Sequence, residues 1–571
     1  MMDVPPSAHE GSPKLPRRRL FGAAGIAGVS GLLAAHHRAL ELPASATPET
    51  ASAQEDEEGL SGAVVISSVS TVDSLDPALA VDTETERVCR QVFESLIGID
   101  RETGATAPLL ATDWEVSSDG LTHTFELRQD VTFHDGADLT AEAVAANVER
   151  WGRLDELYGA GNLRQSVPLA FESVFGGFLG DESCVFDSVE VEDDHTLVLH
   201  LTEPVVFLVQ ALTLPAFGIV SPETLSDEDP GLVSRSPTGT GAYRVAQYEP
   251  DEIVLEAYED HWNGGSAAAA ELPEDSAPEK VMVTAVPRSF DRLRDLQRGR
   301  VDVYDYITAD NLRPLVQSGR LILQRDPFSI LYLGFNLDHP VMAQAEVREA
   351  AARAVDRSGL VERFFLEGTR TAHEFVPAAL GVQSEEARRY GRNMETAQEL
   401  LEDSDYDGEP LPFYYPMTAT RSYLPQPEAV YAAIAADLTE AGFSIRPRPV
   451  PWDEGYVDQL LGDEGRAMHL LGRNGGYRSA HSFLGPLFAR ATSEFHYDNE
   501  DVRDLIRKAR GEEDEETRNA LYREVTEIVS DELPALPLVF PISGVALGQR
   551  VADYPMSPVL HELFRDVRTA I

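Results

Sequence analysis

Short apolar segments of two periodicities alternate along the chain from about residue 62 to residue 551. Runs such as GAVVISSV (62–69) and ILYLGFNL (330–337) are typical of buried strands, since they are short and largely apolar. Segments with apolar residues three and four positions apart, such as 141–151, predict helices. Because both kinds mix throughout without an internal repeat, the sequence predicts an α/β architecture. Its 571 residues are too many for one simple core, so two or three domains are expected.

Local signals place further elements. Thr140 precedes the helical pattern at 141–151 and is expected to cap it, and Gly442 is expected to end the helix that begins near Pro427. The remaining predictions are a helix at 83–97, strands within 121–133, a hairpin at 187–201, two strands within 239–258 joined at Pro250-Asp251, a surface insert at 263–279, a helix running into a strand at 293–307, a helix at 347–356 and a strand ending near 450.

The charge of the chain is strongly one-sided. It has 97 acidic residues against 47 basic ones, a net charge of −50, and lysine occurs only at Lys14, Lys280 and Lys508. The excess is spread along the whole chain, which indicates a solvated acidic surface and favours adaptation to molar salt, where repulsion between carboxylates is screened. An ordinary acidic protein is the alternative. Nucleic acid is not expected as a partner, since phosphate binding needs clustered cations.

The N-terminus resembles an export signal. Arg18-Arg19-Leu20-Phe21 resembles the twin-arginine signature, and the apolar run 20–35 is shorter than the roughly 20 residues that span a membrane. A basic amphipathic helix is the alternative. The polar segment 41–59 is expected to be a tether. No cysteine follows the apolar run and no later segment is long enough to span, so we expect an exported protein without a lipid anchor.

Motifs for catalysis or metal binding are missing from the sequence. There is no HExxH, GxSxG or Walker motif, so neither an enzyme nor a cofactor is expected. The two cysteines, Cys89 and Cys184, are too few for a metal cluster. Cys89 shares a predicted helical face with Phe93 and Leu96, which favours a buried free thiol; a disulfide with Cys184 stays the alternative.

Five segments of the chain carry a family resemblance. The most specific reads PLLATDWEVSSDGLTHTFELRQDVTFHDGADLTAEAVAANVER (108–150), and SPTGTGAYRVAQYEPDEIVLEAYEDHW (236–262) is nearly as specific. The other three are SLDPALAVDTETERVCRQVFESLIGID (74–100), YLGFNLDHPVMAQAEVREAAARAVDR (332–357) and LPALPLVFPISGVALGQRV (533–551). In their order along the chain the five segments resemble the family 5 extracellular solute-binding proteins of ABC importers, which include dipeptide-, oligopeptide- and nickel-binding members.

The resemblance implies a fold and a domain plan. It implies the type II periplasmic-binding-protein fold, in which two α/β lobes are joined by two crossings and lobe I carries an extra subdomain. Mapped onto this chain, residues 1–59 are the twin-arginine signal and tether, 60–325 with 538–571 form lobe I, about 100–230 form its subdomain, and 326–537 form lobe II. The solute is expected between the lobes, and its own contacts stabilise the closed form.

The resemblance also implies binding residues in lobe II. Arg421 falls where dipeptide-binding members place an arginine for the peptide carboxylate, a role that suits the guanidinium fork. An ion pair with a neighbouring acid is the alternative for Arg421. Tyr423 and Tyr415 are expected either to form pocket walls or to pack in the core.

The stretch GRNGGYRSAHSFLGPLF (472–488) departs most from these relatives. The tryptophan usual in the family is Arg473 here, and two usual aspartates fall on Gly476 and Ser479. In peptide binders the first aspartate pairs with the free α-amine, so an ordinary dipeptide becomes doubtful as the solute. Arg473, Arg478 and the neighbouring Tyr477 are expected to contact an anionic or neutral polar solute instead. The alternative is that Glu494 or Asp498 replaces the lost acid.

Together these features predict the extracellular substrate-binding component of an ABC import system. It is expected to capture a peptide-like or other small polar solute and to deliver it, as a monomer, to permease subunits in the membrane. A binding module that feeds a sensor, or a binder of a non-peptide anion, is the alternative. The solute, the cleavage site and the means of retention at the cell surface are left open by the sequence.

Overall fold

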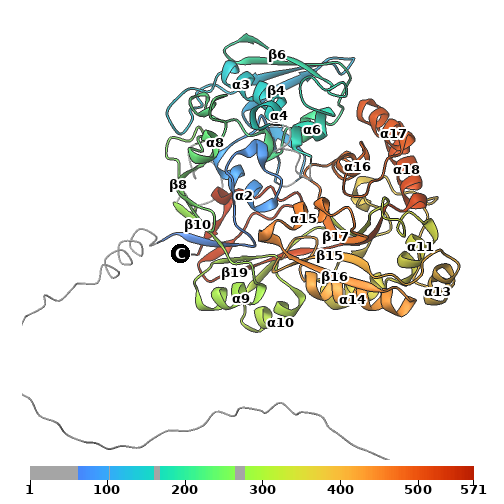
Figure 1. Ribbon diagram of the computed structural model, residues 1–571. Helices are drawn as coiled ribbons and strands as arrows, with labels where there is room; N and C mark the ends of the chain where they lie inside the picture. Colours follow the sequence, from blue (N-terminus) through green and yellow to red (C-terminus); the bar gives the residue numbers. More distant parts are fainter. Residues whose placement is uncertain (1–61, 102, 160–167, 264–276, 571) are drawn as a thin grey trace, which may run out of the picture. The chain divides into compact units, whose positions relative to one another are not determined.

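The computed structural model describes residues 62–101, 103–159, 168–263 and 277–570 (Figure 1). The predicted signal and tether, and nearly all of the predicted surface insert, lie outside these ranges. Three larger sheets organise the described chain, together with two small strand pairs. None of the described helices combines the length and the apolar character that a membrane crossing requires.

The first sheet has seven strands and forms the core of one lobe, called lobe I. In spatial order they are β12 (Leu321–Arg325), β19 (Ser543–Leu547), β11 (Val303–Asp305), β1 (Val64–Ser68), β10 (Lys280–Ala285), β9 (Glu252–Ala257) and β8 (Tyr243–Glu249). Its helices are α2 (Thr83–Val92), α8 (Leu232–Arg235), α9 (Ser289–Arg298) and α10 (Ala309–Gln317). β1 lies between β10 and β11 and is parallel to both. Val64 and Ile66 belong to one apolar cluster and Val65 to another, so both faces of β1 are covered and its sequence is continuously apolar.

A four-stranded antiparallel sheet builds the subdomain of lobe I. Its strands, in order, are β4 (Ala111–Val116), β5 (Thr122–Leu127), β7 (Thr196–Leu201) and β6 (Phe186–Asp193). The helices are α3 (Ala141–Gly152), α4 (Leu154–Tyr158), α6 (Ala170–Phe175) and α7 (Leu208–Ala211). The small pairs are β2 (Ile97–Ile99) with β3 (Thr106–Pro108), and β20 (Val551–Asp553) with β21 (Arg568–Thr569). Thr140 caps α3 as predicted, because its Oγ1 accepts the Ala143 N–H at 3.2 Å.

The six-stranded sheet forms the other lobe, called lobe II. In spatial order its strands are β14 (Arg370–Thr371), β18 (Ala535–Phe540), β13 (Ser329–Phe335), β17 (Met468–Asn474), β15 (Leu411–Met417) and β16 (Ile445–Pro451). Its helices are α11 (Ala345–Ala354), α12 (Arg357–Phe364), α13 (Met394–Glu402), α14 (Pro427–Ala441), α15 (Tyr456–Gly462), α16 (His481–Phe488), α17 (Glu500–Gly511) and α18 (Glu515–Glu532). Every residue of β13 is buried. α14 ends at Gly442, whose φ of 111° is the left-handed conformation that glycine adopts without strain.

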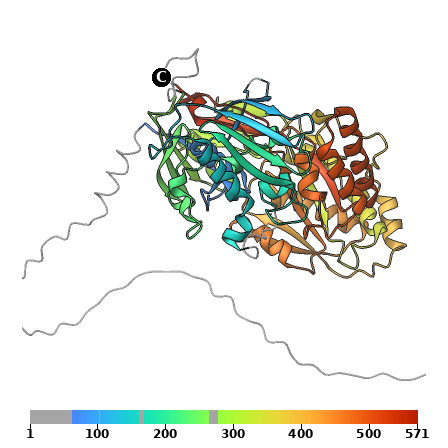
Figure 2. The ribbon, with the colours of Figure 1, turned by 90° about the horizontal axis from the view of Figure 1, so that it is seen from above.

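The chain passes between the two large sheets twice, after β12 and after β18. In Figures 1 and 2 the red C-terminal segments accordingly return among the blue and green elements of lobe I. A buried ion network holds the first crossing. Arg325, the last residue of β12, contacts Asp305 at 2.6 and 2.9 Å and Glu562 at 2.5 and 2.7 Å. Arg87 of α2 pairs with the same Asp305.

Most of the predicted elements are confirmed by the structure. The hairpin is β6–β7, Pro250-Asp251 joins β8 to β9, and the helix-to-strand segment is α9–β11. The helix predicted at 83–97 is wrong at its end, because α2 stops at Val92 and Phe93 is already extended. Both cysteines are free thiols, and Cys89 is buried in the core of lobe I.

Candidate functional site

Arg421 lies in the loop between β15 and α14, where lobe II contacts lobe I. Its side chain is buried, and its Nη1 donates a hydrogen bond to the Ser70 Oγ of lobe I at 3.2 Å. The guanidinium lies over the Trp452 ring, 3.8 Å from the ring centroid. Among the described residues no carboxylate lies within 4.0 Å of its nitrogens, and Nε has no hydrogen-bond partner. The part of the chain that the structure describes therefore contains no ion pair of Arg421, and the buried Nε is left without a hydrogen-bond partner.

Arg473 lies one residue before the end of β17 and is half-buried. Its Nε donates a hydrogen bond to the Ser482 carbonyl at 3.4 Å. Burial lowers the pKa of Arg473, and nearby groups that include Glu86 of lobe I act in the opposite direction. In the described part of the chain it too has no carboxylate within 4.0 Å. Lobe II thus presents two arginines without ion-pair partners.

Glu84 of α2 lies in lobe I opposite Arg421. It is fully buried, and its Oε2 is 3.3 Å from Arg87 Nη1. Burial raises the pKa of Glu84, while the positive charges of Arg87 and, more weakly, Arg421 lower it. Glu84 is therefore held by its own helix and balances Arg421 from a distance.

Glu86 lies two residues further along α2 and is half-buried. Burial raises the pKa of Glu86 to about 7; Arg90 and Arg473 oppose this rise, and Asp82 adds to it. The Asp82 carboxylate is already used, because it caps α2 by accepting the N–H groups of Glu84 at 3.0 Å and Thr85 at 3.1 Å. Acidic groups from lobe I and basic groups from lobe II thus meet where the lobes touch.

Polar and aromatic side chains complete this contact. Asn474 at the end of β17 donates its Nδ2 hydrogen bond to Thr83 Oγ1 of lobe I at 2.9 Å and accepts one from Ser422 Oγ at 2.5 Å. Tyr423 is buried against Gly472, where an added Cβ would lie 2.2 Å from the tyrosine ring. Burial raises the pKa of Tyr423 to about 12, so its hydroxyl stays protonated.

The glycine-rich loop after β17 packs against the subdomain of lobe I. Tyr477 stacks on Phe207, with ring centroids 5.6 Å apart, and belongs to the apolar cluster of the subdomain. A Cβ added at Gly476 would lie 2.5 Å from Leu214 Cδ2. Leu214 would have to turn aside to admit any side chain at position 476.

Two other predicted site residues, Tyr415 and Arg478, have contacts away from Arg421 and Arg473. Tyr415 stacks on Tyr431 of α14, with ring centroids 3.7 Å apart. Arg478 is exposed, and its Nη1 is 3.2 Å from the position of a Cβ added at Gly104 of lobe I. No recorded contact joins either residue to Arg421 or Arg473, so their role in binding stays a prediction.

The two acids considered as replacements have other partners. Glu494 Oε1 accepts a hydrogen bond from Tyr332 Oη at 2.7 Å and lies 3.1 Å from His469 Nε2, inside lobe II. Asp498 pairs with Arg503. Neither carboxylate is therefore free to take the place of an aspartate at Gly476.

The lobes also contact each other where the subdomain meets α17 and the segment that precedes α17. Arg510 donates to Glu203 Oε2 at 3.2 Å, its carbonyl accepts the Val206 N–H at 3.0 Å, and Arg490 pairs with Glu172 of α6. Figure 1 shows α6 and α17 close together. The structure is therefore a closed arrangement, in which side chains from both lobes shield the arginines from bulk water.

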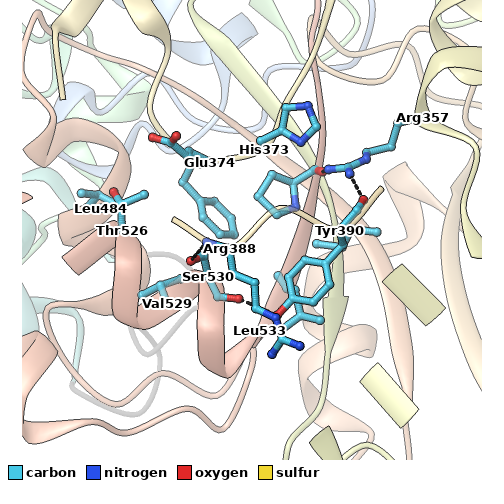
Figure 3. A pocket seen from close by; sticks show the side chains of 14 residues that line it. Arg357, His373, Glu374, Arg388, Tyr390, Leu484, Thr526, Val529, Ser530 and Leu533 are labelled. Atoms are coloured by element: carbon cyan, nitrogen blue, oxygen red, sulfur yellow. Dashed lines mark hydrogen bonds between the residues drawn. The ribbon is translucent and has the colours of Figure 1, made fainter. Parts of the chain in front are cut away.

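A separate cavity lies inside lobe II, between α18 and β18 (Figure 3). Arg357 spans it and donates hydrogen bonds to the carbonyl oxygens of Ala372, at 2.8 Å, and Tyr390. The volume of this cavity, about 10 Å³, is enough for roughly one water molecule, so the cavity is excluded as a site for an organic solute. Among the described residues no group of three or more His, Cys, Asp or Glu side chains is placed to hold a metal ion.

The acids of α2 were missed by the sequence reasoning. TETERVC (83–89) carries Glu84 and Glu86 in the first turn of a helix, where acids are common because they oppose the helix dipole. Their second property, the electrostatic influence of Arg421 on Glu84 and of Arg473 on Glu86, depends on how the lobes meet, because these residues are more than 300 positions apart in the chain.

Comparisons with known proteins identify the family. The model of the bacterial extracellular solute-binding proteins, family 5 Middle, matches residues 105–495. Heme-binding protein A of Haemophilus influenzae is 24% identical over 509 residues, covering 86% of this chain and 89% of that protein. The dipeptide-binding protein of Escherichia coli is 24% identical over 489 residues, covering 83% of this chain and 88% of that protein.

Solved structures show the same fold. The periplasmic binding protein DppA from Helicobacter pylori, in complex with the peptide STSA, matches with a TM-score of 0.78 and 21% identity, covering 89% of this chain and 98% of that one. The dipeptide binding protein from Pseudoalteromonas sp. SM9913, in complex with Met-Leu, matches with a TM-score of 0.78 and 19% identity, covering 89% of this chain and 100% of that one. The predicted two-lobed type II fold is therefore confirmed. The chain belongs to the family 5 extracellular solute-binding proteins of bacteria.

Proposed function

We propose that the chain captures a small organic solute bearing a carboxylate, peptide-like in size and polarity, between its two lobes and delivers it to the permease of an ABC importer. Membership of the family supports the solute-binding role, and relatives include binders of dipeptides and of heme. The observation that carries the carboxylate is Arg421, a buried guanidinium at the contact between lobes whose Nε–Nη2 edge is unpaired.

Four of the predicted residues act together in this proposal. Arg421 binds the solute carboxylate through its open edge, and Arg473 adds a second positive charge half-buried in the same contact. Tyr423 and Tyr477 supply apolar walls, one within lobe II and one against the subdomain of lobe I. The same two arginines also suit a non-peptide anion, so the peptide-like character of the solute depends on its other groups.

Closure of the lobes is the proposed mechanism. A solute that contacts both lobes stabilises the closed arrangement relative to an open one, and the permease recognises that arrangement. The two crossings after β12 and β18 are the places where the backbone bends, and the network around Arg325 holds lobe I rigid beside them. The protein therefore needs no chemical step, only a difference in affinity between open and closed forms.

We further propose where the protein works. The pair Arg18-Arg19 directs export of the folded chain, and the protein acts as a monomer at the outer face of the membrane or free outside the cell. The net charge of −50 with three lysines supports a salt-rich medium, in which the acidic surface is screened. The same family plan proposes lobe boundaries at 325/326 and 537/538; the second falls within β18, whose last residue, Phe540, still belongs to the sheet of lobe II.

Native mass spectrometry of the purified protein tests this function. We expect a co-purified solute of low mass, which dissociates on denaturation and carries at least one carboxylate. A protein that purifies empty and takes up nothing from a library of peptides, organic acids, sugars and metal complexes would contradict the proposal.

A further inference from the structure

A second cavity, of about 130 Å³, lies in lobe I. It is lined by residues of α2, of the strands β2 and β3, of the segment 213–215 and of the C-terminal segment 561–565. Roughly 10–15 Å³ of such a volume holds one water molecule, so this cavity has room for a compound of several non-hydrogen atoms. In the described part of the chain every lining residue belongs to lobe I, and neither Arg421 nor Arg473 is among them. The cavity is therefore separate from the candidate solute site.

Two arginines line this cavity, and neither has an acidic partner. Arg90, near the end of α2, is only 8% exposed. Among the described residues its guanidinium donates hydrogen bonds through Nη1 alone, to the Thr213 carbonyl at 3.5 Å and to His561 Nδ1 at 2.7 Å, and its buried Nε has no partner. Arg565 is half-buried, and its guanidinium has neither a hydrogen bond nor an ion pair in the same part of the chain. Both positive charges are thus left without a carboxylate within 4.0 Å.

Other polar side chains of the lining already have partners within the protein. Gln91 uses both its amide nitrogen and its amide oxygen in hydrogen bonds to lobe I backbone, and Ser95 Oγ donates to a backbone carbonyl at 2.9 Å. Glu94, the acid of the lining, lies 3.1 Å from His261 Nε2 through Oε1 and accepts the Trp262 Nε1–H at 2.9 Å through Oε2. The lining thus carries two positive charges and one negative charge, and the negative charge is the one that has partners.

The unpaired charges favour an anion as the occupant of the cavity. Burial lowers the pKa of His561 well below its usual range, and Arg90 and Arg565 lower it further, so the ring is neutral and accepts from Arg90 without adding charge. A buried guanidinium that lacks an acid is unfavourable, and an anion beside it offsets that cost. Much of the remaining lining is apolar, with Ile99, Leu109 and Leu563 among it. This combination suits a carboxylate on a short hydrocarbon chain.

We propose that this cavity of lobe I binds a small monocarboxylate whose charged end lies on Arg90 and Arg565. The hydrocarbon part of the compound packs against the apolar lining. The bound compound joins α2 to the segment 561–565, which are already linked by the Arg90–His561 hydrogen bond and by the Phe564 N–H, which donates to Gln91 Oε1 at 2.8 Å. Because lobe I supplies the whole described lining, the site stays complete when the lobes open, and it goes beyond the proposed function without resting on it.

Thermal unfolding of the full chain in the presence of butyrate tests this site. Butyrate carries one carboxylate on a short hydrocarbon chain, and butyramide is a neutral control of nearly the same shape. A sulfonate buffer salt that is too large for the cavity keeps the ionic strength constant, so that screening of the acidic surface does not change. Since a ligand of the folded state raises the unfolding midpoint by mass action, the dependence of the midpoint on butyrate concentration gives an apparent dissociation constant.

The variants separate this cavity from the proposed solute site. Wild type is compared with Arg421→Gln, in which butyrate gains nothing from the arginine at the contact between the lobes. Arg565→Gln, Arg90→Gln and Arg298→Gln are each added to Arg421→Gln. Arg298→Gln is the matched control, because Arg298 is an exposed arginine at the end of α9 in the same lobe.

Butyrate, but not butyramide, is expected to raise the unfolding midpoint of Arg421→Gln, with the same dissociation constant when Arg298→Gln is added. Adding Arg565→Gln or Arg90→Gln is expected to raise the dissociation constant at least about tenfold, because a charge-assisted contact is lost. Arg90→Gln removes hydrogen bonds of the fold, whereas Arg565 has none to lose, so Arg565→Gln decides the test if the Arg90 variant does not fold.

Equal dissociation constants with and without Arg565→Gln would overturn the proposal, as would an equal shift of the midpoint by butyramide. No shift of the midpoint of Arg421→Gln by butyrate would overturn it as well. Sulfate or bromide that stabilises the protein as strongly as butyrate would overturn the assignment to a carboxylate with a hydrocarbon chain. All of these results leave the proposed capture of a solute between the lobes untouched.

Discussion

Arg421→Gln is expected to weaken the binding of a carboxylate-bearing solute about 100-fold. The Nη1 of Arg421 is occupied by Ser70 Oγ, so the edge formed by Nε and Nη2 is what the solute can use. A hydrogen bond to a charged group contributes about 1.5–3 kcal/mol, and glutamine keeps neither the charge nor the paired donors. A loss of about 3 kcal/mol corresponds to roughly two factors of ten in affinity.

Calorimetry with the solute released from the purified protein, and with the amide of that solute, measures the effect. Arg421→Lys keeps the charge without the planar fork and is expected to lose about tenfold. Arg446→Gln is the matched control, because Arg446 is an exposed arginine on β16 of the same lobe, and its affinity should equal that of the wild type. Equal affinities of the wild type and Arg421→Gln would refute the role of Arg421, as would an equal loss for the acid and its amide.

Four further predictions concern stability. Arg325→Leu should lower the free energy of unfolding in urea by about 3–5 kcal/mol, because it removes the ion-pair partner of the buried Glu562 and leaves the buried Asp305 with Arg87 alone, whereas Arg300→Leu, at a site 63% exposed, should change it by less than about 1 kcal/mol. Equal effects of the two substitutions would contradict the buried network. Gly472→Ala should lower the free energy of unfolding by about 1–3 kcal/mol in the same assay, since the added Cβ would lie 2.2 Å from the Tyr423 ring. An unchanged free energy of unfolding would show that the Tyr423 ring moves freely. Burial raises the pKa of Glu86 from 4.5 to about 7, so the folded state binds the proton more tightly than the unfolded state. The free energy of unfolding should therefore fall as the pH rises from 4.5 to about 7. Glu86→Gln should remove this part of the pH dependence of the free energy of unfolding, and an unchanged pH dependence would contradict the prediction. With a net charge of −50, the free energy of unfolding should rise between about 0.1 M and about 1 M KCl as the Debye length falls from roughly 10 to 3 Å, and a flat response would argue against adaptation to salt.

Local signals in the sequence were sufficient for much of the fold. Thr140 and Gly442 bound their helices as expected, because a cap and a left-handed glycine act within a few residues. The predicted end of α2 was wrong because it was based on the local apolar pattern alone. The apolar pattern of VFESLI continues past Val92, but Phe93 and Leu96 reach the core from extended backbone instead of a helix.

The candidate site was only partly accessible to sequence reasoning. Arg421 and Arg473 were predicted as site residues through positions that the family resemblance implies, and their role in binding stays a prediction. Ser70 was not predicted, because its importance comes from a hydrogen bond across the lobes to Arg421, 351 residues away in the chain. Gly476 appeared in the sequence as a missing acid, and the structure adds that residue 476 lies against the Leu214 side chain of lobe I.

Solution X-ray scattering tests the central claim, capture of a solute between the lobes, most directly. The protein is unfolded, freed of solute, refolded and measured with and without the compound that native mass spectrometry identifies. We predict a smaller radius of gyration with the compound than without it, and no such change for Arg421→Gln at the same concentration. Identical scattering with and without saturating compound, across the wider solute library, would contradict the account.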